Sequence, residues 1–426
     1  MRPALVLVVL LLAVTVVRAE PVAVRDMRHA YDPVVVRTAL LGNPPDRHTA
    51  HYRVFAARDG RLEPIPFQFD PMDADGMLVF TDGADDSFDR DDELVLMAKD
   101  TGDRVDTAQL PAGGGAAFEI EVTDAARGTR GWAYLVYFPE TPPPVSPVRY
   151  AHFDVGRNTA ETPWYEIRYA PPPSNHLVGL RVAATSGAPT TPLIDGTRMR
   201  IGPTFSLLLT TWSPVFTERS FTVKPEGVRN GAVRAIRRVR QSLDMGRFFP
   251  ELPNGRVQTF YYENAVLTPS TFEIPSIILA ALRDFRFEAI HDFGARAPGT
   301  RYWDAANPDG LPLDAARDRA GTDADHGWWV ASGATGTLLN AFVIPQLWRD
   351  WGITRGTVLS GDDDAPDVHG AGYRLRKMTN LRRGGSYALA TAMVILPTPY
   401  TPGDEAEALA MLDTPLDVRV HPMRQP

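Results

Sequence analysis

The stretch Asp70–Arg104 reads DPMDADGMLVFTDGADDSFDRDDELVLMAKDTGDR, and it joins acidic clusters to short apolar runs. The runs MLVF and ELVLM have the length and the residue types of short, buried β-strands. The carboxylates between these runs repel one another unless water or a cation neutralises them. The stretch therefore predicts β-structure around an acidic loop in the N-terminal part of the chain.

Strand-like segments continue on both sides of this stretch. They alternate apolar and polar residues and are separated by Gly, Pro and Asp turns, as in PVVVRTALL (33–41), HYRVFAA (51–57), AAFEIEVTD (116–124) and GWAYLVYF (131–138). So many short strands over such a length predict a small, closed or nearly closed β-barrel that spans residues 20–139.

The segment ETPPPVSP (140–147) contains three consecutive prolines, which form a stiff, extended connector. We interpret it as a linker between two domains, and the alternative is a rigid loop within one domain. Longer strand-like segments follow it, and no repeat of fixed period is visible. They predict a large antiparallel β-sandwich, or supersandwich, over residues 148–426. The expected fold class is therefore all-β.

Two segments of this second part need a closer assignment. The run 231–246, GAVRAIRRVRQSLDMG, fits either a helix or a strand. We favour a long strand, because its neighbours read as strands and its charged residues fit an exposed face. The segment Pro402–Leu412 is the best helix candidate, since acidic residues occupy its first turn.

Residues 1–19 have the features of a signal peptide. Arg2 is followed by an apolar run from Ala4 to Val17, and Val17 and Ala19 are the small residues that a signal peptidase reads. We therefore expect export to the periplasm or the extracellular space. The run is short for a membrane span, and no second run of spanning length follows, so an integral membrane protein is not expected.

The composition excludes several classes of function. The chain has 52 acidic and 44 basic residues and a formal net charge of −8 at pH 7, which disfavours nucleic acid as a partner. It has no cysteine, so disulfides, thioether-linked haem and cysteine-bound iron–sulfur clusters are excluded. GxSxG, HExxH, Walker A and GxGxxG motifs are absent. We therefore expect neither a haem nor a nucleotide cofactor, and we assign no catalytic residue.

The acidic loop approximates a twelve-residue calcium loop. With Asp82 at position one, Asp86 falls at position five and Phe88 at position seven, where only a backbone carbonyl is needed. Glu93 falls at position twelve, where a bidentate carboxylate is expected. Two other positions depart from the pattern. The sequence therefore predicts a structural calcium ion, and the alternative is a solvated loop in which aspartates stabilise turns.

Aromatic and polar residues cluster in the predicted sandwich, as they do in sugar-binding clefts, where rings stack on sugars and polar groups bind hydroxyls. The candidate ligand-binding residues are Tyr262, Trp303, Asp325, His326, Trp328 and Trp329. Arg238, which would share a strand face with Arg234 and Arg240, could bind the carboxylates of an acidic glycan. The alternative is that the tryptophans belong to the core and that the arginines pair with Asp and Glu on a solvated face.

This layout resembles secreted carbohydrate-active proteins in which a β-barrel precedes a mutarotase-like supersandwich, as in polysaccharide lyases. The resemblance rests on PIPFQFD (64–70), DRDDELVLMAKDTGDR (89–104), HGWWVASG (326–333) and GGSYALATAMVILP (384–397). It implies an exported protein that binds a glycan or another extracellular polymer, with lyase-like activity as an extension. The alternative is a non-enzymatic scaffold of the cell envelope or a partner protein of a surface assembly. An open apolar groove without a polar cleft would favour that alternative.

Overall fold

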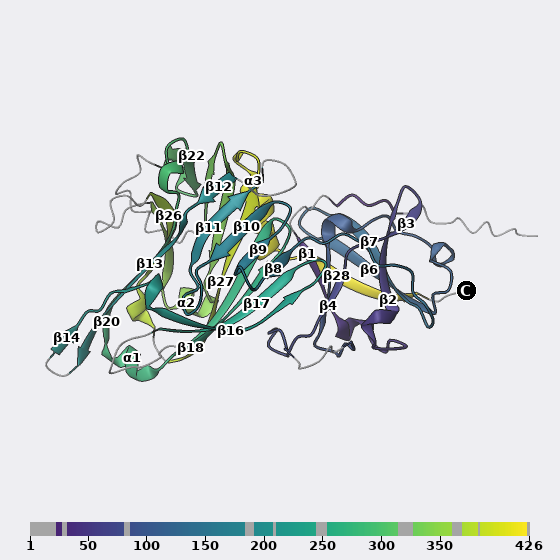
Figure 1. Ribbon diagram of the computed structural model, residues 1–426, viewed down its shortest axis with the longest axis horizontal. Helices are drawn as coiled ribbons and strands as arrows, with labels where there is room; N and C mark the ends of the chain where they lie inside the picture. The colour runs from purple at the N-terminus through teal and green to yellow at the C-terminus, as the bar shows by residue number, and fades with distance from the viewer. Residues whose placement is uncertain are drawn as a thin grey trace, which may run out of the picture.

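The computed structural model describes residues 23–27, 32–80, 86–183, 191–207, 210–243, 254–313, 327–359, 369–381 and 384–423. Figure 1 shows two units arranged along the longest axis of the molecule. Antiparallel strands dominate both units, so the all-β prediction is confirmed. Of the helices in these ranges, none has the length and apolar character needed to cross a membrane.

The first unit contains two sheets. Its five-stranded sheet has the order β28 (Asp417–Met423), β6 (Ala116–Asp124), β7 (Thr129–Tyr137), β2 (Tyr52–Arg58) and β3 (Arg61–Pro64). Its three-stranded sheet has the order β1 (Pro33–Arg37), β5 (Glu93–Met97) and β4 (Gln68–Asp70). Both sheets are open paths, so the described strands form two layers rather than the closed barrel that was one expectation for this part of the chain.

The three-stranded sheet is buried on both faces. Val34 and Leu94 point into the core of the first unit, whereas Val95 and Met97 pack against Val330 and other residues of the second unit. This position explains why all five residues of ELVLM are buried, as the sequence predicted. The sheet is therefore a shared layer between the two units.

The second unit, hereafter the sandwich, contains three antiparallel sheets. The largest has nine strands in the order β16 (Phe221–Asn230), β17 (Ala235–Leu243), β18 (Asn254–Tyr261), β19 (Ala265–Ile274), β27 (Gly385–Leu396), β24 (Gly336–Val343), β23 (Trp328–Gly333), β21 (Arg301–Asp304) and β22 (Asn307–Pro312). The six-stranded sheet contains β14 (Thr210–Trp212), β13 (Gly196–Leu207), β20 (Leu282–Asp292), β26 (Gly370–Arg376) and β25 (Thr354–Leu359), with β15 (Phe216–Thr217) paired to β13. The third sheet has the order β12 (Thr191–Ile194), β11 (Leu177–Val182), β10 (Tyr165–Tyr169), β9 (Thr159–Glu161) and β8 (His152–Asp154).

One continuous core joins these three sheets. Leu180 of the third sheet, Trp329 of the nine-stranded sheet and Tyr373 of the six-stranded sheet belong to the same buried cluster. The α-helices are short and lie at the ends of strands: α1 (Ser276–Ala281), α2 (Gln346–Asp350) and α3 (Asp404–Asp413). Single 3-10 turns complete the described chain: η1 (Thr38–Leu41), η2 (Thr49–His51), η3 (Ala98–Asp100), η4 (Thr107–Gln109), η5 (Glu218–Ser220), η6 (Gly294–Arg296) and η7 (Met378–Asn380). The prediction of a large antiparallel sandwich is therefore confirmed.

The predicted assignment of the C-terminal strand to the sandwich needs correction. The sequence placed the last strand in the sandwich, but β28 pairs with β6 of the first unit from Asp417↔Thr123 to Met423↔Ala117. Figure 1 shows β28, in yellow, among the purple and blue strands of that unit. Val418 and Val420 pack on the core of the first unit, which gives the strand its reason to return there.

The two ambiguous segments are resolved as expected. The arginine-rich run forms β17, and its residues pair with β16 on one side and β18 on the other. The C-terminal helix candidate forms α3, with Asp404, Glu405 and Glu407 in its first turn. Carboxylates there stabilise the positive end of the helix dipole. The proline-rich segment 140–147 lacks regular structure and runs between β7 and β8.

Candidate functional site at the junction of the two units

A buried ion cluster lies where the first unit meets the sandwich. Asp70 ends β4 and Glu93 begins β5, and the two residues are paired in register, so their side chains leave the same face of the small sheet. Arg234, in the turn before β17, reaches both carboxylates: Nε lies 2.8 Å from Asp70 Oδ2, and Nη2 lies 2.7 Å from Glu93 Oε2. Its Nη1 donates a hydrogen bond to the Tyr262 hydroxyl at 2.8 Å.

Gln68 completes this cluster. Its amide nitrogen donates to both oxygens of Asp70, and its amide oxygen accepts from the backbone N–H groups of Val233 and Arg234. Burial opposes the charge on Arg234, but Tyr262, Asp70 and Glu93 outweigh that effect, so the pKa of Arg234 is raised and the side chain stays charged. Because its groups are paired with one another, we assign the cluster a structural role.

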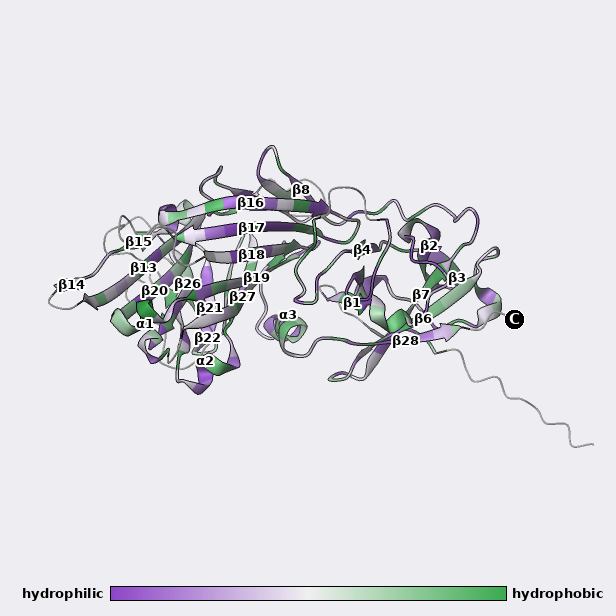
Figure 2. Ribbon diagram, turned by 90° about the horizontal axis from the view of Figure 1, so that it is seen from below, coloured by the Kyte–Doolittle hydropathy of each residue, from purple (hydrophilic) through white to green (hydrophobic). Residues whose placement is uncertain are grey.

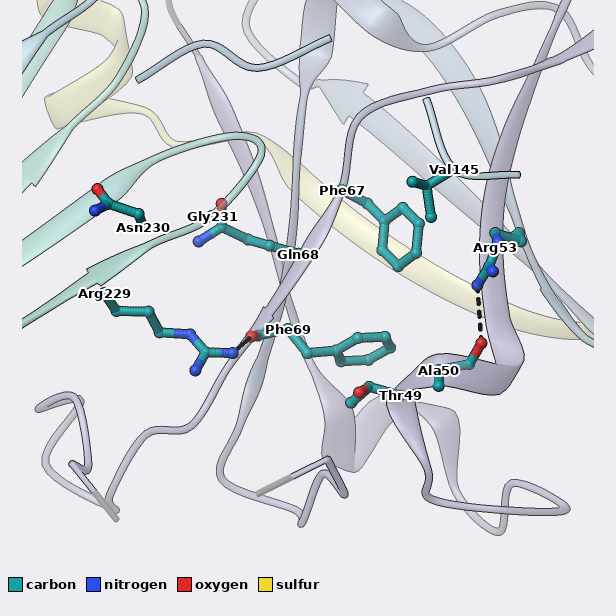
Figure 3. A pocket seen from close by; sticks show the side chains of 10 residues that line it. All are labelled: Thr49, Ala50, Arg53, Phe67, Gln68, Phe69, Val145, Arg229, Asn230 and Gly231. Atoms are coloured by element: carbon teal, nitrogen blue, oxygen red, sulfur yellow. Dashed lines mark hydrogen bonds between the residues drawn. The ribbon is translucent and has the colours of Figure 1, made fainter. Parts of the chain in front are cut away.

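A pocket of about 320 Å³ opens beside the ion cluster (Figure 3). Its walls come from both units and from the proline-rich segment; they are formed by Thr49, Ala50, Arg53, Phe67, Gln68, Phe69, Val145, Arg229, Asn230 and Gly231. A Cβ at Gly231 would lie 2.0 Å from the Gln68 Oε1, so any other residue here would displace the amide of Gln68. The pocket is therefore built on the contact between the two units.

Two arginines stand on opposite sides of this pocket, with the rings of Phe67 and Phe69 between them (Figure 3). Arg229 donates from Nε to Asp70 Oδ1 at 3.2 Å and from Nη2 to the Phe69 carbonyl at 2.7 Å. Arg53 donates from Nε to the Pro143 carbonyl at 2.6 Å and from Nη1 to the Ala50 carbonyl at 2.9 Å. Both guanidinium groups are thus fixed in place by hydrogen bonds to neighbouring residues.

Each arginine keeps donor capacity for a ligand. Within the part of the chain that the structure describes, Arg229 Nη1 and Arg53 Nη2 have no hydrogen-bond partner, and the residues lining the pocket include no carboxylate. Burial lowers the pKa of Arg53, so an anion beside it would stabilise a charge that is incompletely solvated. The pocket therefore suits a small anionic group next to an apolar ring surface.

Trp329 and Tyr262, proposed as sugar-stacking residues, belong to the core, which corrects the interpretation for these two. Trp329 is fully buried and packs against His291, Tyr302 and Tyr373. Trp303 and Trp328 are partly buried in the cluster that joins the sandwich to α3, and Trp303 lies 5.0 Å from the ring of Tyr400. The Tyr262 hydroxyl accepts a hydrogen bond from Arg234 and so belongs to the ion cluster. The alternative of core tryptophans therefore holds for Trp329, whereas Trp303 and Trp328 pack against the core with part of their surface exposed. Asp325 and His326 lie outside the described residues.

The arginine row is paired with an acidic residue. Arg238 Nε lies 2.7 Å from Glu226 Oε2, and Arg240 binds the other oxygen of the same carboxylate. Arg238 also donates to the Leu78 carbonyl and covers the ring of Phe80. Arg234 does not share their face, because it lies before β17 and turns into the junction. Arg238 thus attaches the acidic stretch to the sandwich and does not line the pocket.

The candidate calcium ligands that the structure describes lie in different environments. Glu93 is held by Arg234, and Phe88 is a core residue whose ring stacks on Phe69 at 4.9 Å. Asp86 is exposed, and its backbone carbonyl accepts from Thr49. Asp82 lies outside the described residues. Among the residues described, no group of three His, Asp or Glu side chains is placed to hold a metal ion, and calcium stays a prediction.

The sandwich also contains a set of hydrogen-bonded polar side chains around His291, which the sequence does not predict. His291 on β20 receives a hydrogen bond at Nε2 from the Asn340 amide, 2.8 Å away, and its Nδ1 lies 3.0 Å from the Thr197 hydroxyl. Tyr373 donates to the other end of Asn340. Burial lowers the pKa of His291 to about 4, so the ring is neutral at pH 7 and serves packing.

Arg53 and Arg229 were also missed, and a single sequence holds little that could have revealed them. The segment PIPFQFD contains Phe67 and Phe69, but Arg229 is 160 positions from Phe69. Only the pairing of β4 with β5, and the close approach of both to the β16–β17 turn, brings these residues together.

Comparisons with known proteins find only distant structural similarity. No protein-family model matches this sequence, and no curated protein does. Among solved structures, an alpha-mannosidase from Enterococcus faecalis V583 is similar over 95% of this chain and 45% of its own, with 9% identity and a TM-score of 0.48. This chain thus spans about half of the mannosidase.

Two other solved structures match a smaller share of this chain. A protein assigned as an aldose 1-epimerase from Escherichia coli K12 matches 55% of this chain and 96% of its own, with 9% identity and a TM-score of 0.32. A protein assigned as a mutarotase from Salmonella typhimurium matches 60% and 96%, with 8% identity and a TM-score of 0.30. Identities and TM-scores this low transfer no activity to this chain.

Proposed function

We propose that this protein is an exported glycan-binding protein whose junction pocket takes a carboxylate-bearing sugar residue. The observation that carries the proposal is the pair of anchored arginines, Arg53 and Arg229, on opposite walls of one pocket. A guanidinium binds a carboxylate through two parallel N–H···O bonds, which makes arginine the preferred side chain for this group. The partly exposed ring of Phe67 offers the apolar face on which a sugar ring stacks.

The proposed function is glycan binding alone, without catalysis of a lyase reaction. Lyase chemistry needs a base that removes a proton from the sugar, and the remaining polar lining residues, Thr49, Gln68 and Asn230, are not bases near neutral pH. Gln68 and Asn230 are moreover engaged, since Asn230 is hydrogen-bonded through both amide atoms to the backbone of Phe153. The arginines could neutralise a uronate carboxylate, but nothing in the described lining would complete the reaction.

Calorimetric titration with uronic-acid oligosaccharides, and with neutral malto-oligosaccharides of equal length, tests this proposal. We expect binding of the acidic series only, weakening as salt is raised, because charged hydrogen bonds carry it. Loss of one such bond costs roughly 1.5–3 kcal/mol, so Arg53→Gln and Arg229→Gln should each weaken binding about 10- to 100-fold.

Arg240→Gln is the matched control, because Arg240 is exposed, pairs with Glu226 and does not line the pocket. It should bind the oligosaccharides as the unmodified protein does. Equal binding of neutral and acidic sugars, or full binding by both pocket variants, would contradict the proposal.

A further inference from the structure

A second cavity, of about 360 Å³, lies inside the sandwich and is almost entirely apolar. It separates the nine-stranded sheet from the six-stranded sheet, and α1 borders it. Val257, Phe272 and Leu389 line it from the nine-stranded sheet; Phe205, Phe285 and Phe287 line it from the six-stranded sheet. No charged side chain is among its described lining residues, and it shares none of them with the junction pocket.

The size and lining of this cavity are unusual for a protein interior. Interiors are packed to crystal density and contain few voids larger than a water molecule. Some of the side chains that line the cavity are themselves well buried, Trp348 and Leu375 among them. A cavity of this chemistry favours apolar ligands, because water inside it would find few polar partners. The sandwich therefore contains a preformed site for hydrocarbon.

Apolar surface continues from the cavity to the outside. Trp212, 37% exposed, stacks at 5.5 Å on the ring of Phe205, which lines the cavity. Val215, 55% exposed, precedes the lining residue Phe216. Ile277, 69% exposed, belongs to α1, which Figure 2 shows as strongly hydrophobic. Exposed apolar groups next to a cavity are typical of a binding entrance.

We propose that this cavity binds a fatty acid, with its single acyl chain between the sheets. An α-helix is about 10–12 Å wide with its side chains, so a cavity of this volume cannot admit a helix or a folded partner, whereas a flexible unbranched chain can fill it. Arg283 is exposed and immediately follows the lining residue Leu282, so it is the cation that we assign to the carboxylate of the fatty acid. Its Nη1 donates to the carbonyls of Ala280 and Leu282, and none of the described ion pairs includes it.

The experiment is a displacement titration of the full chain, with cis-parinaric acid as the fluorescent probe and saturated fatty acids of increasing length as competitors. Each methylene moved from water into an apolar site strengthens binding roughly fourfold. We expect this gain for each added carbon until the cavity is full, and a constant affinity beyond that length. Methyl esters of the same chain lengths should bind more weakly, since they carry no charge for Arg283.

Ser270→Phe is the decisive variant. Ser270 lies on β19 in register with Val257 and Leu389, so its side chain points into the cavity and a phenyl ring there takes up part of the space that a long acyl chain needs. Ala388→Phe is the matched control, because Ala388 is exposed and pairs with Thr271 on the opposite face of the same sheet. We expect Ser270→Phe to lose at least tenfold in affinity for long chains and Ala388→Phe to retain it.

Circular dichroism and thermal melting establish that both variants are folded. Should Ser270→Phe lose its fold, Leu389→Trp provides the same test from the neighbouring strand. The proposal is overturned if no fatty acid displaces the probe, if affinity is independent of chain length, or if a folded, filled variant binds like the unmodified protein. Arg229→Gln should leave fatty-acid binding unchanged, which separates this proposal from glycan binding at the junction.

Discussion

Arg234 places a positive charge in the junction between the two units, where its side chain is only 2% exposed. The charge is stable there because Asp70, Glu93 and Tyr262 all face it. Removing one partner of a buried ion pair costs about 3–5 kcal/mol, since the other charges remain buried without compensation. We therefore expect Arg234→Met to lower the free energy of unfolding by about that amount, as measured by chemical denaturation.

Arg240→Met is the control for this substitution. Arg240 is half-exposed and pairs with Glu226 on the sheet surface, so its loss should cost no more than about 1 kcal/mol. Equal, small effects of the two substitutions would show that the cluster contributes little to stability.

The sequence could identify the carboxylates of this cluster but not their partner. Asp70 and Glu93 stand out because they flank apolar runs in an acidic stretch. Arg234 was one of four arginines in a short run, and local pattern gave no reason to separate it from Arg238 and Arg240. It differs only because the chain turns at Gly231, beside Gln68, and presents Arg234 to another sheet. The distinct role of Arg234 therefore depends on the tertiary structure and cannot be read from the local sequence.

At the scale of elements, local pattern was a reliable guide to strands and helices and a poor one to their partners. The runs that became β5, β17 and α3 were recognised from apolar spacing and charge. The same kind of pattern predicts a cleft at the tryptophans of β21 and β23, although Trp329 is buried between sheets and Trp303 and Trp328 pack against the core. Whether a face meets solvent or a second sheet is decided by packing between distant segments.

The acidic loop before β5 is the element for which calcium remains a proposal. Glu93 would have to leave Arg234 to act as a ligand, so an ion would rely on Asp86 and other carboxylates of the loop. An ion that binds only the folded state adds about 2.7 kcal/mol at one hundred times its dissociation constant. We expect millimolar calcium to raise the melting midpoint by several degrees, and a chelator or Asp86→Asn to abolish that rise.

Magnesium at the same concentration is the control for this measurement, because it prefers fewer protein ligands and a tighter geometry. Identical midpoints in calcium and in chelator would remove the calcium proposal.

At the scale of the whole molecule, the two units share parts and are not simply joined by a linker. The three-stranded sheet belongs to the cores on both sides. The C-terminal segment crosses the junction a second time: Ala408 and Met411 of α3 pack on Val330 and Leu339 of the sandwich, and β28 then joins the first unit (Figure 2). The sequence predicted two units but could not reveal these crossings, since a C-terminal strand carries no local sign of the sheet it joins.

These shared parts predict cooperative unfolding. A full chain should melt in a single calorimetric transition, because the shared three-stranded sheet and β28 couple the two units. Truncation after Thr414 removes β28, leaves β6 at an open edge and withdraws Val418 and Val420 from the core of the first unit. Each valine contributes about 1.5–3 kcal/mol when fully buried, and about half of that here, since both are partly exposed. A loss near 2 kcal/mol in a unit of this size lowers its midpoint by roughly 10 °C.

The truncated chain should therefore show two transitions in scanning calorimetry, the first unit melting below the sandwich. Truncation after Met423 is the matched control, because it shortens the same terminus but keeps the whole of β28. It should melt as the full chain does. A single unshifted transition in the chain that ends at Thr414 would mean that the buried sheet and the Arg234 cluster couple the units without β28. Two transitions in the full chain would mean that the shared layer does not couple them at all.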